Sequence, residues 1–265
     1  LTIVKQHQKL RLQVKTYFQL YDESTVIRVW KKVINLGEDL IGIEEIPSLS
    51  LSGILQQDFY PGDYTKNILL YLAHNGWTAE AQWTKNYLSE YGLVYMADGM
   101  KEEASSKRIS VTNNSSWSCS EYSPQGILHN EKTNQTAIWQ IENNGAWHFE
   151  IEDTDNGGLL NIQLSGPEEY DNNWWKNLSA GESFTSVIVA YTQTNGNFES
   201  GIAEMTKYRR VTRRANDDNQ KLPVIFNDYM NGLMGNPTTE NEIPLINAAY
   251  KIGAEYYVID CGWYD

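Results

Sequence analysis

The sequence predicts a mainly β protein, a large antiparallel β-sandwich followed by one strand–helix–strand unit. Residues 1 to about 195 contain many short segments rich in β-branched and aromatic residues, and Gly, Asn, Asp or Pro bounds each segment. Beyond residue 197 the apolar residues recur at helical spacing. Two nearly all-apolar segments then flank an amphipathic helix, which is typical of parallel strands. The architecture therefore changes near residue 200.

Composition excludes several classes of protein. The chain has 265 residues and a formal net charge of −13, with 41% hydrophobic and 21% charged residues. That length suggests one large domain or two ordinary ones. Nucleic-acid binding needs Lys and Arg at the phosphates, so we expect no nucleic-acid partner. No apolar run is long enough to cross a membrane, so we expect no membrane partner either.

The predicted strands of the sandwich alternate or cluster apolar residues over four to seven positions. They are Arg11–Tyr17, Thr25–Trp30, Ile68–Leu72, Ala137–Ile141, Trp147–Ile151, Leu159–Leu164 and Ser186–Tyr191. Asn143–Gly145 lies between two of them and predicts a hairpin, because Asn and Gly tolerate the positive φ of a tight turn. Asp155–Gly158 predicts a second hairpin. We expect the sandwich domain to cover residues 1–197.

Phe198–Arg214 is predicted to be helical, since its apolar residues are spaced by three. Its basic C-terminal end suits the negative end of the helix dipole, and we interpret the basic run as a solvated face. Ala215–Gln220 is polar and predicts a linker. Residues 198–220 are therefore expected to form a helical linker.

Residues 221–265 predict a βαβ unit. Pro223–Asn227 and Tyr256–Asp260 are the two strands, and Thr239 with Glu242 predicts a capping box at the start of the helix between them. Short connections favour a right-handed crossover and parallel strands. Two parallel strands cannot bury both of their faces, so we expect further βα units and interpret the chain as a fragment.

Polar and aromatic residues follow both predicted parallel strands, where sites of α/β proteins lie. These residues are Asn227, Asp228 and Tyr229 after the first strand, and Asp260, Cys261 and Trp263 after the second. Carboxylate and amide groups hydrogen-bond sugar hydroxyls, and an aromatic ring stacks on a pyranose, so a neutral sugar is the predicted ligand. Spacing alone equally allows Asp260 to be a turn former and Trp263 to be core.

Other chemical motifs are absent from the sequence. The histidines are scattered without metal-ligand spacing, and nothing matches a P-loop, a dinucleotide-binding turn or a Ser nucleophile elbow. Glu168–Glu169 is a pair of neighbours in sequence, which would point to opposite faces of a strand. We therefore predict no metal site and no cofactor. Cys119 and Cys261 are expected to be free thiols, which favours a reducing, cytoplasmic location.

Several segments of the chain carry a resemblance to a known family. Pro223–Asn231, Thr238–Glu240 and Gly253–Trp263 resemble the start of the catalytic barrel in the bacterial α-galactosidases of glycoside hydrolase family 36. Segments similar to its N-terminal domain are His74–Gln82, Trp139–Gly145, Leu164–Pro167 and Tyr208–Arg210. The resemblance implies a supersandwich joined through a helical segment to a (β/α)8 TIM barrel, of which residues 221–265 would be the truncated start.

The resemblance also implies a function. The family is retaining and metal-free, and it removes terminal α-linked galactose from oligosaccharides. Its nucleophile and its acid/base, both Asp, lie downstream of Asp265 in the family's order, so this chain would hold no catalytic residue and be inactive alone. Assembly as a homo-oligomer is implied as well.

By resemblance, the chain retains part of the galactose-binding shell. Asp260 and Trp263 match the first Asp and the Trp of an Asp-Asp-Gly-Trp motif, and Tyr229 matches an aromatic wall. Cys261 replaces the second Asp, which leaves an α-N-acetylgalactosaminidase or a galactosyl-transferring relative open.

An N-terminal loop reaches a galactose pocket in some members of the family. Here Asp58 and Asp63 match that loop, but Lys66 stands where an Arg is expected, and Lys makes a single-point contact instead of a fork.

A non-catalytic β-sandwich carbohydrate-binding module is the alternative from another class. Such a module should end near residue 200. The predicted βαβ tail therefore favours the enzyme.

Overall fold

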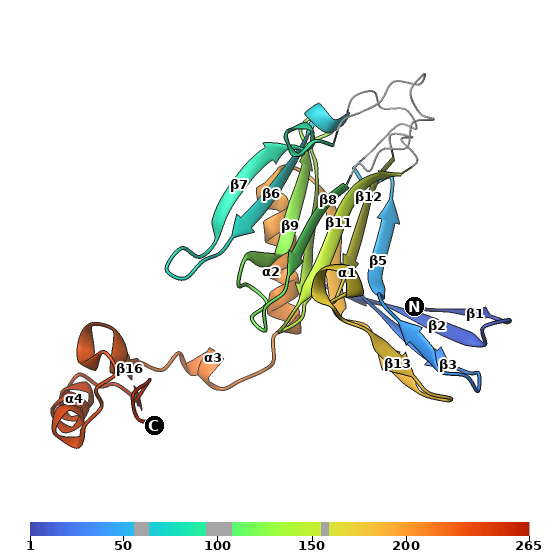
Figure 1. Cartoon of the computed structure of the whole chain (residues 1–265). Coiled ribbons are helices and arrows are strands. Elements are labelled where there is room, and N and C mark those ends of the chain that lie inside the picture. Colours follow the sequence, from blue (N-terminus) through green and yellow to red (C-terminus); the bar gives the residue numbers. More distant parts are fainter. Residues whose placement is uncertain (56–63, 94–107, 155–158, 265) are drawn as a thin grey trace. The chain divides into compact units, whose positions relative to one another are not determined.

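The computed structural model describes residues 1–55, 64–93, 108–154 and 159–264. The chain divides into two compact units, Leu1–Thr212 and Arg213–Asp265 (Figure 1). The first is built almost entirely from antiparallel strands, and the second contains a parallel pair. No helix among the described residues is long and apolar enough to span a bilayer.

Two facing sheets make up most of the first unit. Among the described residues the larger sheet has nine strands in the order β1 (Thr2–His7), β2 (Leu12–Tyr21), β3 (Ser24–Asn35), β15 (Ile188–Asn195), β10 (Gln135–Glu142), β9 (Tyr122–Asn130), β6 (Ile68–His74) and β7 (Gln82–Tyr87), with β14 (Ser183–Thr185) also beside β3. The described part of the second sheet has four strands, in the order β5 (Pro47–Ser52), β12 (Leu159–Ser165), β11 (Trp147–Thr154) and β8 (Arg108–Asn113). The predicted antiparallel sandwich is confirmed.

Smaller elements connect these strands. They are β4 (Ile41–Ile43) paired with β13 (Lys176–Leu178), the 3₁₀ turns η1 (Tyr64–Lys66) and η2 (Leu88–Tyr91), and the short helix α1 (Glu169–Asn172). In the larger sheet, β3 pairs with β15, which places Val29 opposite Val189. The sheet therefore joins strands from the two ends of the unit.

Aromatic side chains fill the space between the two sheets. Trp139 of β10 and Trp147 and Phe149 of β11 are fully buried there. Phe149 meets Trp139 edge-on at 5.2 Å between ring centroids and stacks on Trp147 at 5.9 Å. Gly126 of β9 lies opposite Trp139, and a Cβ at Gly126 would lie only 2.3 Å from Trp139 Cζ2. Glycine at this position makes room for the indole.

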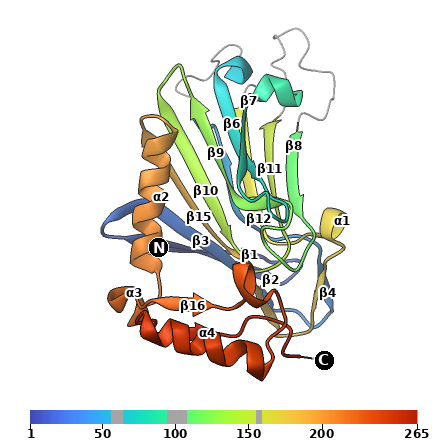
Figure 2. The ribbon, with the colours of Figure 1, turned by 90° about the vertical axis from the view of Figure 1, so that its left-hand side faces the viewer.

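Helix α2 (Phe198–Thr212) covers the other face of the larger sheet (Figure 2). Its Met205 and Tyr208 are fully buried against Ile138 and Ala190. Because side chains alternate along β10, Ile138 faces the helix while its neighbour Trp139 faces the sandwich. The central strands of the sheet are thus buried on both faces, whereas β1 at its edge is exposed along its whole length.

The packing of α2 corrects the predicted helical linker over residues 198–220. Its apolar side binds the sheet, so the helix belongs to the first unit, which ends at Thr212. At its basic end, Arg209 donates hydrogen bonds to Gln140 (2.8 Å) and Gln125 (2.7 Å). Residues 218–221, expected in the linker or next to it, form the short helix α3 (Asp218–Lys221).

The predicted hairpin at Asn143–Gly145 is wrong. This turn connects β10 of the larger sheet to β11 of the smaller one. Both sides of β10 are already occupied, by β9 and β15, so β11 has no free edge on which to pair. The second predicted hairpin is confirmed by its strands, since β11 and β12 pair with Thr154 opposite Leu159, although its turn lies outside the described residues.

The second unit contains the predicted βαβ arrangement. Strands β16 (Ile225–Asn227) and β17 (Tyr256–Val258) are parallel, and helix α4 (Thr239–Lys251) lies between them in the chain. The N-cap of α4 is Thr238 and not Thr239, and its side chain accepts from the Asn241 amide. Glu242 is then free to accept a hydrogen bond from the Tyr257 hydroxyl of β17.

Apolar residues of this unit remain exposed. Ile225 is 59% exposed, Val258 38% and Ile246 of α4 41%. The two strands were predicted to be covered on both faces, and in the described unit they are not. The unit therefore carries an apolar surface available for further packing.

Replacing Gly126 by Ala should destabilise the first unit. The added methyl would clash with the fully buried Trp139, and overpacking of a dense core typically costs about 1–3 kcal/mol. Urea unfolding followed by tryptophan fluorescence measures the change. Gly145→Ala is the matched control, because no heavy atom lies within 4 Å of its Cβ position. Equal stability of the two variants would contradict the proposed role of Gly126.

Candidate functional site

The carboxyl ends of β16 and β17 lie side by side. Parallel pairing places Asn227 opposite Val258, so the chain leaves both strands at the same edge. One residue earlier, Phe226 and Tyr257 stack with ring centroids 5.3 Å apart. The stacked rings hold the two strand ends in register. The residues that follow form the predicted site.

A hydrogen-bond network joins the two strand ends. Asn227 Nδ2 donates to Asp260 Oδ2 at 2.7 Å, and the Asp260 amide donates to Asp228 Oδ1 at 2.9 Å. Asn227 Oδ1 in turn accepts from the Tyr229 amide at 2.9 Å. The network fixes the backbone and the side chain of Asp260 together. Asn227 is central to it, although the sequence prediction named it only as one of the polar residues after the strand.

Asp228 and Asp260 have different environments. Asp228 is only 2% exposed, whereas Asp260 is exposed to solvent. The buried carboxylate binds the Asp260 backbone, and the exposed one keeps acceptor capacity for a ligand. This arrangement favours a positioning role for Asp228 and a contact role for Asp260.

Trp263 presents an open aromatic face. It is 66% exposed, and its indole Nε1 donates to the Asp260 carbonyl at 3.1 Å. Tyr264 meets the indole edge-on with centroids 5.2 Å apart. The indole is thus anchored beside Asp260 while most of its surface remains free. A flat aromatic next to a carboxylate is an arrangement that suits a sugar ring and its hydroxyls.

The loops after the two strands cross in close contact. The first contains a π-helical turn, η4 (Tyr229–Leu233), and ends at Gly235; the second contains Gly262. Gly262 has φ +84°, and a Cβ there would lie 2.1 Å from the Gly235 carbonyl oxygen. Nothing in the sequence pattern indicates this crossing. Both glycines are required for it, because a side chain at either position would separate or strain the loops.

Tyr229 and Cys261 lie at this crossing. The Cβ position of Gly235 is 3.4 Å from Cys261 Sγ and 3.7 Å from Tyr229 Cε2, and both side chains are partly buried. Desolvation and the carboxylates of Asp260 and Asp228 raise the pKa of the Cys261 thiol. The thiol therefore stays protonated at neutral pH and offers no anionic acceptor to a ligand. Asp58 and Asp63 lie outside the described residues.

Gly262→Ala should loosen the network around Asp260. The new methyl would collide with the Gly235 carbonyl, so the Asp260 amide should exchange with solvent at least about tenfold faster, as expected for loss of roughly 1.4 kcal/mol of local protection. Hydrogen exchange measured by NMR reports this amide directly.

Gly253→Ala is the control for Gly262→Ala. Gly253 has nearly the same φ, +81°, but no heavy atom lies within 4 Å of its Cβ position. Gly253→Ala therefore imposes the strain of a left-handed backbone on an alanine, without a collision like the one with the Gly235 carbonyl. The same acceleration at Asp260 in both variants would mean that the loop crossing does not support the site.

Solved structures share this fold. No protein-family profile and no curated protein matches the sequence. The chain aligns over 100% of its length with the GH36 α-galactosidase AgaA from Geobacillus stearothermophilus, at a TM-score of 0.80 and 15% identity, covering 33% of that chain. The galactosidase domain of the α-galactosidase–sucrose kinase AgaSK aligns at a TM-score of 0.78 and 18% sequence identity. The alignment covers 100% of the present chain and 33% of the AgaSK chain. The α-galactosidase from Lactobacillus brevis aligns at a TM-score of 0.76 and 14% sequence identity, over 100% of the present chain and 32% of its own.

AgaA has been solved in complex with stachyose and with raffinose. The present chain spans about a third of the length of these enzymes. At such low sequence identities the likeness shows the fold alone. The fold that the resemblance to glycoside hydrolase family 36 predicted is confirmed.

Proposed function

We propose that the chain is part of a retaining α-galactosidase that hydrolyses terminal α-linked galactose from oligosaccharides. The observation that carries this proposal is the alignment of the whole chain with α-galactosidases, together with the exposed Asp260 and Trp263 at adjoining strand ends. Asp260 would accept hydrogen bonds from galactose hydroxyls, and Trp263 would stack on the sugar. Asn227 and Asp228 would hold Asp260 in place.

The second unit is proposed to be the first βαβ repeat of a (β/α)8 barrel. Its parallel strands and their exposed apolar residues support this, because further βα units would cover Ile225, Val258 and Ile246. The catalytic carboxylates would come from those units. Retention would require them to lie about 5 Å apart across the glycosidic bond. A homo-oligomeric, cytoplasmic enzyme belongs to the same proposal, as does a contribution of Asp58 and Asp63 to the sugar pocket.

Cys261 bears on the identity of the sugar. A protonated thiol replaces an acceptor carboxylate, so the hydroxyl that the carboxylate would bind loses a strong partner. An α-N-acetylgalactosaminidase or a galactosyl-transferring enzyme is therefore the second candidate. Kinetics on paired galactoside and N-acetylgalactosaminide substrates distinguish the two hydrolases.

Asp260→Asn in the whole protein should lower kcat/KM for a chromogenic α-galactoside by about 10², because a preorganised acceptor in the transition state is lost. Glu240→Gln is the control, an exposed carboxylate in the first turn of α4. Unchanged kinetics of Asp260→Asn, with galactosides and galactosaminides alike, would reduce Asp260 to a turn former.

The 265-residue chain by itself should show no turnover, whereas the protein extended through the proposed barrel should. Both are assayed on the same chromogenic substrate at equal molar concentration, after circular dichroism has established that the chain is folded. Turnover by the 265-residue chain would place the nucleophile within it and overturn the assignment of catalysis to further units.

A further inference from the structure

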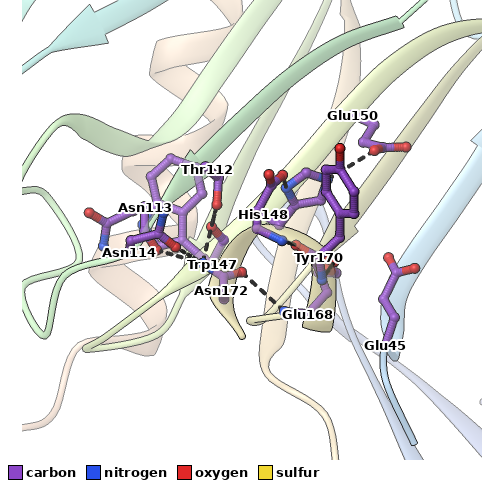
Figure 3. Close-up of polar contacts among 12 residues, drawn as sticks. Glu45, Thr112, Asn113, Asn114, Trp147, His148, Glu150, Glu168, Tyr170 and Asn172 are labelled. Carbon is purple, nitrogen blue, oxygen red and sulfur yellow. Dashed lines mark hydrogen bonds and ion pairs between the residues drawn. The ribbon is translucent and has the colours of Figure 1, made fainter. Parts of the chain in front are cut away.

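A polar cleft lies on the outer face of the four-stranded sheet, in the first unit. Along β11, Trp147, Phe149 and Ile151 point into the core, so His148 and Glu150 point to the opposite face. The segment around α1 closes over this face (Figure 3). The cleft has a volume of about 490 Å³ and is lined by Glu45, Arg108, His148, Glu150, Glu168, Tyr170 and Asp171.

His148 is the key residue of the cleft. It is 3% exposed, and its Nε2 lies 3.1 Å from Glu150 Oε1, so that nitrogen carries the proton and donates to the carboxylate. Its Nδ1 is buried and has no hydrogen-bond partner, with Asp171 Oδ2 at 3.4 Å. In this tautomer Nδ1 presents an unused lone pair to the cleft. A buried imidazole nitrogen is costly to leave unsatisfied, which points to a ligand.

Two carboxylates face this nitrogen. One ligand atom each from His148, Glu168 and Asp171 lie within 4.8 Å of one another. Glu168 is 8% exposed, and its side chain is the N-cap of α1, accepting from the Tyr170 amide at 2.6 Å and from the Asp171 amide. These bonds fix the carboxylate and leave it further lone pairs. Asp171 is the most exposed of the three donors, with 27% of its side chain accessible to solvent.

The surrounding charges favour a cation. Four carboxylates line the cleft, and one guanidinium, Arg108, binds Glu150 at 2.6 Å. Desolvation, together with the carboxylates of Glu150 and Glu168, raises the pKa of the Glu45 carboxyl. Acidic groups are therefore crowded in a partly desolvated space. A bound cation would relieve this repulsion.

We propose that His148 Nδ1, Glu168 and Asp171 form a site for a divalent transition-metal ion, with Zn²⁺ the best match. Zinc is bound by imidazole nitrogen and carboxylate oxygen at about 2.0–2.2 Å, which requires donors roughly 3.3–3.5 Å apart. His148 Nδ1 and Asp171 Oδ2, 3.4 Å apart, already meet this requirement, and a small movement of the turn that holds Glu168 would supply the closure. Glu150 acts as the outer carboxylate that orients the ligating histidine. The open cleft leaves a fourth position for water.

Such a site would be structural for the first unit. The ion would join β11 to α1, whose Asn172 already donates hydrogen bonds to Thr112 and Asn113 of the neighbouring strand β8. A ligand that binds the folded state alone raises the free energy of unfolding with the logarithm of its concentration once that concentration exceeds Kd. The ion would thus clamp the segment containing α1 onto the four-stranded sheet.

The test is Zn²⁺ binding to the whole protein after removal of metal with a chelator. Calorimetric titration and elemental analysis should give one Zn²⁺ per chain, and Tm should rise with Zn²⁺ concentration. Asp171→Asn should weaken binding at least about tenfold. Glu169→Gln removes a carboxylate from the same helix at an exposed position outside the cleft, so its affinity should equal that of the unmodified protein.

Other outcomes would overturn the site. Absence of stoichiometric Zn²⁺ would mean that His148 simply pairs with Glu150 and Asp171. Equal weakening by Asp171→Asn and Glu169→Gln would indicate general charge attraction. Co²⁺ provides an independent readout, because ligation produces visible absorption bands, and Asp171→Asn should require more Co²⁺ to develop them while Glu169→Gln should not.

Discussion

The centre of the larger sheet must be covered on both faces, and the architecture of the first unit follows from that constraint. Its central strands carry apolar side chains at successive positions, so one face binds the four-stranded sheet and the other binds α2. Strand β6 is buried along six successive residues for this reason. Without α2, residues such as Ile138 and Ala190 would be exposed to water. The helix is therefore part of the sandwich, not a spacer after it.

The candidate sugar site depends on a different interaction, the parallel pairing of β16 and β17. Pairing brings Asn227 and Asp260 together although they are 33 positions apart in the chain. The buried Asp228 then fixes the Asp260 backbone, and the glycine crossing lets the two loops touch. The site is thus held by backbone contacts, while its exposed groups remain available to a ligand.

Local patterns in the sequence predict the elements well and their partners poorly. Alternation and turn residues locate the strands, and the apolar stretches near the end predict the parallel pair. Periodicity does not encode which strand pairs with which. The sequence therefore predicted a hairpin at Asn143–Gly145, whereas this turn connects strands of two different sheets. Consecutive threonines led to an N-cap of α4 predicted one residue too late: Thr238 caps the helix, and Glu242 accepts from Tyr257 instead of reaching back to the cap.

The His148 cleft shows the same limit. His148 and Asp171 belong to different elements, and no sequence spacing indicates that they meet. Glu168 and Glu169 were set aside as neighbours on a strand. In fact they begin a short helix, where the first caps the helix and faces His148 while the second points to solvent. Glu168 and Asp171 are neighbours in one helical turn, and tertiary structure adds His148 to them.

The pairing of β3 with β15 has a consequence for how the protein is made. Thr25 on β3 bonds to Thr192 on β15 across 167 positions of the chain. A ribosome must synthesise nearly the whole first unit before the inner edge of β3 can find its neighbour, and closing so long a loop slows folding. The nascent chain would expose an unpaired strand edge during that interval, and chaperones that shield such edges would then matter for its yield.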